Sequence, residues 1–143
     1  MGKKIKVVFD TNVWVSIFMK KVLSEEFAEV NEKIVVFISE DIILEISKVL
    51  IYPKIAEILR ESRIHEKQIL HAISANSKVI KPKLKLHIIE EDLEDDKILE
   101  CALAAGADII VTGDKHLLKL GKFRKTKILT PRQFLDYLQE NGE

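Results

Sequence analysis

Two apolar runs far apart in this sequence each end in an aspartate. Residues 7–10 end at Asp10, and residues 109–114 end at Asp114. Short runs rich in β-branched residues predict buried parallel strands, and ligands of such sheets bind beyond the carboxyl ends of the strands. We therefore expect the two carboxylates to meet at one edge of a sheet, where they would suit a metal ion.

A third carboxylate, that of Glu45, lies on a predicted helix over residues 40–51. On a helical wheel, Glu45 falls about 100° from the centre of the apolar face, at the border of the buried surface. Of the acids on this helix, it is the one best placed to face a crevice. The same position is also typical of an ordinary boundary glutamate, so the wheel alone does not decide its role.

An acidic run supplies the fourth candidate. Six of the seven residues from 90 to 96 are acidic, and most of such a run is expected to be a solvated loop before a helix. A metal site needs only Asp95 or Asp96, either of which would cap that helix at the same edge of the sheet. We favour Asp96, because the packing face of the helix begins soon after it, at Ile98. Asp95 is the alternative.

These carboxylates favour a site for Mg²⁺ or Mn²⁺. Like charges a few ångströms apart force some carboxylates to keep protons unless a cation lies between them. Oxygen ligands suit Mg²⁺ and Mn²⁺, whereas zinc and copper sites usually contain histidine or cysteine. The sequence offers no histidine cluster, and we expect its histidines to be surface or polar-packing residues. They are His65, His71, His87 and His116.

An acidic metal site with open coordination positions suits phosphate chemistry, in a nuclease or a phosphatase. Basic residues directly after Asp114 favour the nuclease, because they could hold a phosphate backbone. They are also typical of an ordinary solvated helix and loop. This predicted RNA-binding cluster contains Lys115, Lys119, Lys122, Arg124 and Lys125, with Lys127 close behind.

The composition is that of a folded domain. Of 143 residues, 47% are hydrophobic and 32% are charged, and 23 basic residues balance 23 acidic ones. The zero net charge is not typical of a passive nucleic-acid binder. No apolar stretch approaches the roughly 20 residues that span a bilayer, and no signal-peptide pattern opens the chain. We expect one domain over residues 1–143, located in the cytoplasm without membrane contact.

Strand and helix patterns alternate along the whole chain, which predicts an α/β fold. Ser39 is a predicted N-cap, and Thr130-Pro131 with Gln133 forms a predicted capping box. We expect strands at residues 4–10, 34–38, 108–112 and 127–129, and one at an unfixed position within 78–89. We expect helices at residues 12–21, 24–33, 40–51 and 65–77, another ending at Gly106, a short one after Asp114, and a last one reaching 140.

Four segments in this order resemble the PIN-domain family of metal-dependent ribonucleases. The match is closest to an archaeal and bacterial branch described as toxins of toxin–antitoxin pairs, and it covers nearly the whole chain. The segments are residues 8–13, residues 39–45 with Val49-Leu50 and Pro53-Lys54, residues 95–99, and residues 104–108 through 111–114.

The resemblance implies a three-layer α/β/α sandwich with a central parallel sheet of about five strands. It implies hydrolysis of single-stranded RNA at an Mg²⁺ or Mn²⁺ site, leaving a 5′-phosphate. The family's metal-site acids match Asp10, Glu45, Asp96 and Asp114, and its supporting polar residues match Asn12 and Thr112. Where many relatives have an acid two residues past the last aspartate, this chain has His116. That departure weakens the expectation of a second tightly bound metal.

Two other functions compete with a ribonuclease. An aspartyl-phosphate phosphatase would use Asp10 as nucleophile. The sequences of such enzymes have an Asp-x-Asp pattern at this point, whereas this chain has Asn12 in place of the second aspartate. A PIN-like module that binds RNA or protein without turnover is the other alternative, although all four acids are present. As partners we expect single-stranded RNA, a second copy of the chain through apolar residues such as Leu44, and, if the chain is a toxin, a cognate antitoxin protein.

Overall fold

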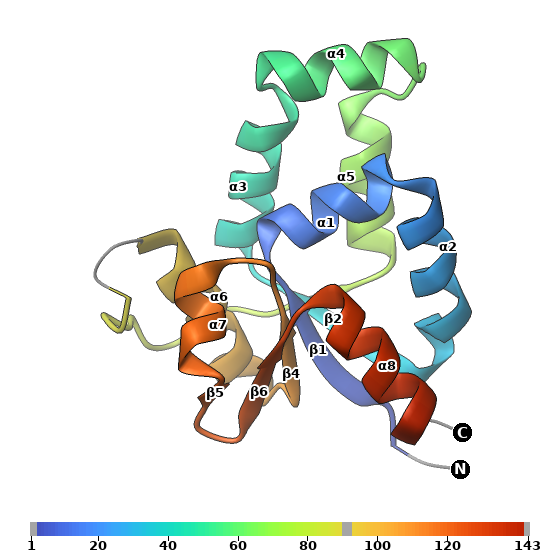
Figure 1. The fold of residues 1–143 in the computed structure, drawn as a ribbon. Coiled ribbons are helices and arrows are strands. Elements are labelled where there is room, and N and C mark those ends of the chain that lie inside the picture. Colours follow the sequence, from blue (N-terminus) through green and yellow to red (C-terminus); the bar gives the residue numbers. More distant parts are fainter. Residues whose placement is uncertain (1–2, 90–92, 142–143) are drawn as a thin grey trace.

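Six strands form the centre of the computed structural model, which describes residues 3–89 and 93–141 (Figure 1). The sheet has the order β3-β2-β1-β4-β6-β5. All neighbouring strands are parallel except β5 and β6, which form an antiparallel hairpin at one edge. The strands are β1 (Ile5–Phe9), β2 (Ile34–Ile38), β3 (Lys78–Val79), β4 (Ile109–Val111), β5 (Lys122–Phe123) and β6 (Thr126–Leu129).

Helices cover both faces of this sheet and give a three-layer α/β/α sandwich. Helix α6 packs across β1, β2 and β4 with α7 beside it, while α2 and α8 lie on the other side, and α3 to α5 form an arm above the sheet (Figure 1). The helices are α1 (Thr11–Met19), α2 (Lys21–Val30), the 3₁₀ helix η1 (Asn31–Lys33), α3 (Glu40–Leu50), α4 (Pro53–Glu61), α5 (Glu66–Ala75), α6 (Leu93–Ala105), α7 (Lys115–Leu120) and α8 (Pro131–Asn141).

The strand register brings distant segments to the same edge of the sheet. In the central pairing, Phe9 of β1 lies opposite Val111 of β4, and Val111 in turn lies opposite Leu129 of β6. Each of these residues is the last of its strand. The chain therefore leaves β1, β4 and β6 side by side, and whatever follows these strands shares one edge of the sheet.

Two apolar layers hold this arrangement together. On one side, the ring of Phe9 makes edge-on contacts with Trp14 and Phe27 at centroid distances of 5.1 and 5.3 Å, and Phe134 of α8 completes the cluster at 6.2 Å. On the other side, α6 contributes fully buried small and aliphatic residues, including Cys101. Burial raises the pKa of the Cys101 thiol to about 12, as for a packed thiol and not a nucleophile.

Most predicted elements are confirmed. The strand at 34–38 agrees at both ends. The side chain of Ser39 accepts a hydrogen bond from Ile42 N at 3.3 Å, and Thr130 and Gln133 form the predicted capping box, with bonds of 3.0 and 3.1 Å. Gly106 follows α6 at φ 62°, a conformation that favours glycine. The α/β sandwich expected from the sequence is confirmed, with one more short strand, β5, at its edge.

Three elements refine or correct the expectation from sequence. The strand expected within 78–89 is present, and it is only two residues long. Pro53 begins α4, a full helix of nine residues. One local prediction is wrong. Helix α6 begins at Leu93, so neither Asp95 nor Asp96 caps it, and both lie in its first turn. Among the described residues, no helix has the length and apolar character needed to cross a membrane.

Candidate metal-binding active site

Asp10 lies directly after β1 and begins the helix that follows it. Its backbone N–H donates to Val111 O at 3.1 Å, which ties the end of β1 to β4. Its carboxylate caps α1, since Oδ1 accepts from Val13 N at 2.8 Å. The residue is only 6% exposed. The strand end and the helix cap together fix one carboxylate at the sheet edge in a single orientation.

Thr112 joins Asp10 to the second strand-end aspartate. The Thr112 hydroxyl donates to Asp10 Oδ2 and accepts from Asp114 N, the latter at 2.9 Å. Asp114 in turn caps α7, because its Oδ1 accepts from His116 N at 2.8 Å and Leu117 N at 3.3 Å. One buried hydroxyl therefore sets the spacing between the two turns that carry Asp10 and Asp114.

Helix α6 places Asp95 and Asp96 in different surroundings. Asp95 lines a cavity together with Asp10 and Asp114, and its side chain is 9% exposed. Asp96 is absent from that lining and instead accepts two backbone hydrogen bonds through Oδ1, from Ile88 N at 2.9 Å and Ile89 N at 2.8 Å. The geometry therefore favours Asp95 over Asp96 at the site, and Asp96 anchors the segment that precedes α6.

Glu45 of α3 completes the group of acids. The cavity that it lines has a volume of about 80 Å³ and is also lined by Thr11, Asn12 and Ile98. Its walls thus come from β1–α1, α3, α6 and the β4–α7 turn. The structure brings together the predicted Asp10, Glu45 and Asp114, with Asp95 as the fourth acid.

Crowding of carboxylates is visible in the electrostatics of Asp10. Burial raises the pKa of Asp10 above its ordinary value of 3.8, the neighbouring charge of Asp114 raises it further, and the hydrogen bonds from Thr112 and Val13 oppose the rise. A buried carboxyl beside a second carboxyl is a setting that a divalent cation would stabilise. The oxygen-rich lining therefore fits a divalent metal.

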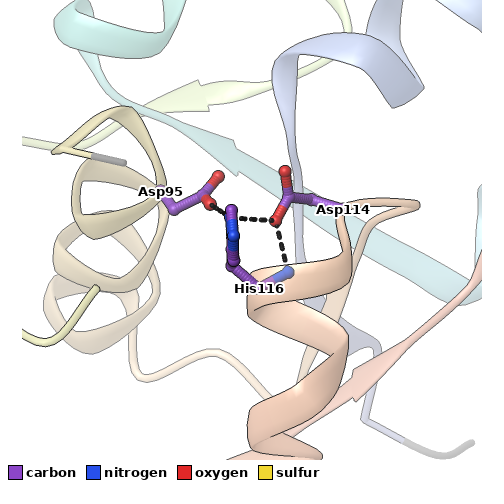
Figure 2. Close-up of side chains that lie close together, drawn as sticks. All are labelled: Asp95, Asp114 and His116. Atoms are coloured by element: carbon purple, nitrogen blue, oxygen red, sulfur yellow. Dashed lines mark hydrogen bonds and ion pairs between the residues drawn. The ribbon is translucent and has the colours of Figure 1, made fainter. Parts of the chain in front are cut away.

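His116 lies beside this cavity, near Asp95 and Asp114, which sequence analysis did not predict. Its Nδ1 is 3.7 Å from Asp95 Oδ2 and 3.7 Å from Asp114 Oδ1, and Figure 2 shows the ring between the two carboxylates. Together these three residues offer ligand atoms within 4.8 Å of one another. The available signal was its position two residues past Asp114, in the first turn of the helix that Asp114 caps.

The predicted basic cluster is divided between the two ends of the sheet. Lys115 and Lys119 belong to α7, which starts at the acidic site. Lys122, Arg124 and Lys125 belong to the β5–β6 hairpin, whose turn lies at the far end of β6 from Leu129 (Figure 1).

A larger cavity, of about 510 Å³, adjoins the acidic one through Asn12, which lines both. Arg132 and Lys20 also line it, and Arg132 forms an ion pair with Glu26 at 2.8 Å. Neither cation was predicted. Arg132 could have been predicted, because it comes shortly after β6, the last parallel strand, just as Asn12 comes shortly after β1.

Comparison with known proteins agrees with this geometry. The family model described as PIN domain matches residues 6–116, from within β1 to the first turn of α7. The chain belongs to the PIN-domain family. PIN domains have a three-layer α/β/α fold and are generally metal-dependent nucleases. The resemblance seen in the four sequence segments is thus confirmed.

A relative from the archaeon Methanocaldococcus jannaschii is similar to this PIN-domain chain over nearly its whole length. It is named "Uncharacterized protein MJ1680", and the two are 34% identical over 152 aligned positions, which cover 96% of this chain and 94% of the relative. The similarity therefore extends past the PIN-domain match, into β6 and α8.

Proposed function

We propose that this PIN-domain protein is a divalent-metal-dependent endoribonuclease that hydrolyses phosphodiester bonds of single-stranded RNA. The observation that supports this most strongly is the cavity lined by Asp10, Glu45, Asp95 and Asp114. Four carboxylates from four separate segments are costly to bring together without a cation. A PIN-domain fold and an acidic cluster are both expected of a metal-dependent nuclease.

In this proposal, Asp10, Asp95 and Asp114 hold Mg²⁺ or Mn²⁺, and Glu45 ligates the metal or orients the attacking water. When bound, the metal supplies activation of water and charge neutralisation at the phosphodiester. Thr112 and Asn12 support the acids: the Thr112 hydroxyl fixes Asp10 and Asp114 relative to each other, and Asn12 lines the cavity mouth between Asp10 and the larger cavity. Asp96, favoured as a ligand from sequence, here has a structural role.

The RNA backbone in this proposal lies across the start of α7. Lys115 and Lys119 are the predicted cations that share a helix with the acidic site, whereas Lys122, Arg124 and Lys125 lie on the hairpin beyond it. Arg132 and Lys20 line the larger cavity that adjoins the acidic one at Asn12, and Arg132 is paired there with Glu26 and Asp136. A strand of RNA entering along α7 would therefore meet the lysines of that helix, with Lys20 in the adjoining cavity.

Cleavage of a panel of labelled single-stranded RNAs tests the proposal. We expect cleavage with Mg²⁺ or Mn²⁺ that stops in EDTA and falls by at least roughly 10²-fold in Asp10→Asn, as for loss of a group that acts in the transition state. His71→Gln, on the exposed surface of α5, is a control that should cleave normally. Cleavage that persists in Asp10→Asn would contradict the proposal. Binding of RNA without metal-stimulated cleavage would favour a non-catalytic module.

Three finer aspects rest on sequence and family resemblance. A role as the toxin of a toxin–antitoxin pair would need a small protein partner that places a basic side chain in the acidic cavity, where it would replace the cation. Whether a neighbouring reading frame encodes such a protein is the direct check. A homodimer and a cytoplasmic location also stay predictions.

A further inference from the structure

We infer that His116 is a nitrogen ligand of the metal, and that it shifts the preference of the site from Mg²⁺ toward Mn²⁺ and other transition metals. This inference rests on the proposed metal-dependent function and specifies its metal chemistry. It starts from the position of the imidazole ring, whose Nδ1 faces Asp95 on one side and Asp114 on the other (Figure 2).

The distances around this ring are too long for direct hydrogen bonds and leave room for a shared cation. Nδ1 lies 3.7 Å from Asp95 Oδ2 and 3.7 Å from Asp114 Oδ1. An N–H···O hydrogen bond needs roughly 2.7–3.2 Å. Two ligands that are each about 2.1 Å from one metal lie about 3.0 Å apart at right angles and about 4.2 Å apart when opposite. Both observed distances fall within this range.

The backbone of His116 is held beside the acids. His116 is the second residue of α7, and its N–H donates to Asp114 Oδ1 at 2.8 Å. The cap that positions Asp114 therefore also fixes the backbone from which the imidazole projects. Asp95 approaches from α6, a different element, so the two carboxylates enclose the ring from separate parts of the chain (Figure 2). A ligand set from rigid helix starts needs little reorganisation on binding metal.

The chemical class of the ligand set follows from this nitrogen. Carboxylates alone suit Mg²⁺ and Mn²⁺, whereas an imidazole nitrogen favours metals later in the first transition row. Replacing an acid with His116 also removes one negative charge from the cluster when the imidazole is neutral, which weakens binding of a hard, strongly hydrated ion such as Mg²⁺. We therefore expect Mn²⁺ and Co²⁺ to bind more tightly than Mg²⁺, with nitrogen directly coordinated.

The test compares metal binding by the whole chain and its variants at one pH after removal of metal with EDTA. Pulsed electron paramagnetic resonance of the Mn²⁺-loaded protein reports ¹⁴N coupling from a bound imidazole, and calorimetry gives the affinities for Mn²⁺ and Mg²⁺. We expect ¹⁴N coupling in the wild type and in the control His71→Gln. In His116→Asp the coupling should disappear, and the ratio of Mn²⁺ to Mg²⁺ affinity should fall roughly tenfold.

His116→Gln, which keeps side-chain length without an imidazole, repeats the test should the aspartate variant not fold. Mn²⁺ bound to the wild type without ¹⁴N coupling, coupling that survives both variants, or an absence of Mn²⁺ binding would each overturn the inference. The outcome is separable from that of the proposed function. Metal-stimulated RNA cleavage without ¹⁴N coupling would remove only the histidine ligand, and ¹⁴N coupling without cleavage of any RNA would remove only the nuclease.

Discussion

A buried carboxylate is useful to a metal site and costly to the fold, and Asp10 shows both effects. Burial raises the pKa of Asp10. Between the unfolded and the folded pKa, its carboxyl therefore keeps a proton in the metal-free folded protein that the unfolded chain has already released. Its contribution to the free energy of unfolding is therefore greatest below pH 3.8 and declines as pH rises toward the folded pKa. Above the folded pKa of Asp10, the ionised carboxylate destabilises the metal-free protein, and bound metal would reverse the effect.

Asp10→Asn should consequently stabilise the metal-free protein while it abolishes metal binding. The amide oxygen can still accept from Val13 N, and the negative charge beside Asp114 is gone. We expect a higher melting temperature than wild type in EDTA at pH 7 to 8, by about 2–4 °C for each kcal/mol gained, and a smaller difference near pH 4. Thermal unfolding with and without Mn²⁺ measures this. A variant less stable than wild type at every pH would show that the hydrogen bonds of Asp10 outweigh its desolvation.

The neighbouring pair Asp95 and Asp96 offers a matched test of which carboxylate serves the site. Asp95→Asn should weaken Mn²⁺ binding and cleavage by at least roughly tenfold, because it removes a charge from the cavity lining. Asp96→Asn should bind metal as the wild type does, since its amide oxygen can still accept from Ile88 and Ile89. Calorimetry with Mn²⁺ on both variants decides. The reverse pattern would restore Asp96, the residue favoured from sequence.

Elements with strong local signals are the ones that sequence analysis predicts well. The buried β-branched strand β2, the serine cap of α3 and the capping box of α8 each depend on a few adjacent residues. The meeting of the two strand-end aspartates can also be predicted, because the carboxyl ends of parallel strands lie at the same edge of a sheet. Elements that depend on distant partners are harder: β3 has only two residues, both exposed, and forms by pairing with β2.

The same reason explains where the geometry of the site differs from the expectation. In the run of acids before α6, several positions satisfy the positive end of a helix equally well, so the sequence cannot fix where the helix starts. A shift of one residue on a helix turns a side chain by about 100°, enough to exchange Asp95 for Asp96. The position of His116 between two acids requires the approach of α6 to α7, which no local pattern contains.

At the level of elements, α7 and the β5–β6 hairpin should contribute differently to RNA binding. Lys115→Ala with Lys119→Ala removes two cations from the helix that starts at the acidic site. We expect weaker RNA binding and a salt dependence whose slope falls by about 0.7 per lost phosphate contact. Lys122→Ala with Arg124→Ala is the matched control, and should change little. Filter binding of a single-stranded RNA at several salt concentrations measures both. Equal losses in the two double variants would place the RNA along the whole basic stretch.

At the level of the whole molecule, the sheet edge concentrates acids in a chain with no net charge. The arm formed by α3, α4 and α5 rises above the sheet (Figure 1). Its helix α3 carries Glu45, which lines the cavity, and Leu44, which is exposed. Leu44, Ile51 and Tyr52 are 59, 64 and 54% exposed, and Ile58 is partly exposed on α4. Apolar residues that gather on one arm are typical of a protein–protein interface.

We therefore expect a homodimer formed through α3 and α4, as predicted from Leu44. Burying one such aliphatic side chain contributes about 1.5–3 kcal/mol, so Leu44→Lys with Ile51→Lys should raise the dimer dissociation constant by roughly 100-fold or more. Val79→Lys is the matched control, because Val79 is 56% exposed but lies on β3, away from the arm. Sedimentation velocity at micromolar concentration should show dimers for the wild type and the control, and monomers for the double variant. A wild type that sediments only as a monomer would leave the exposed arm to a different partner.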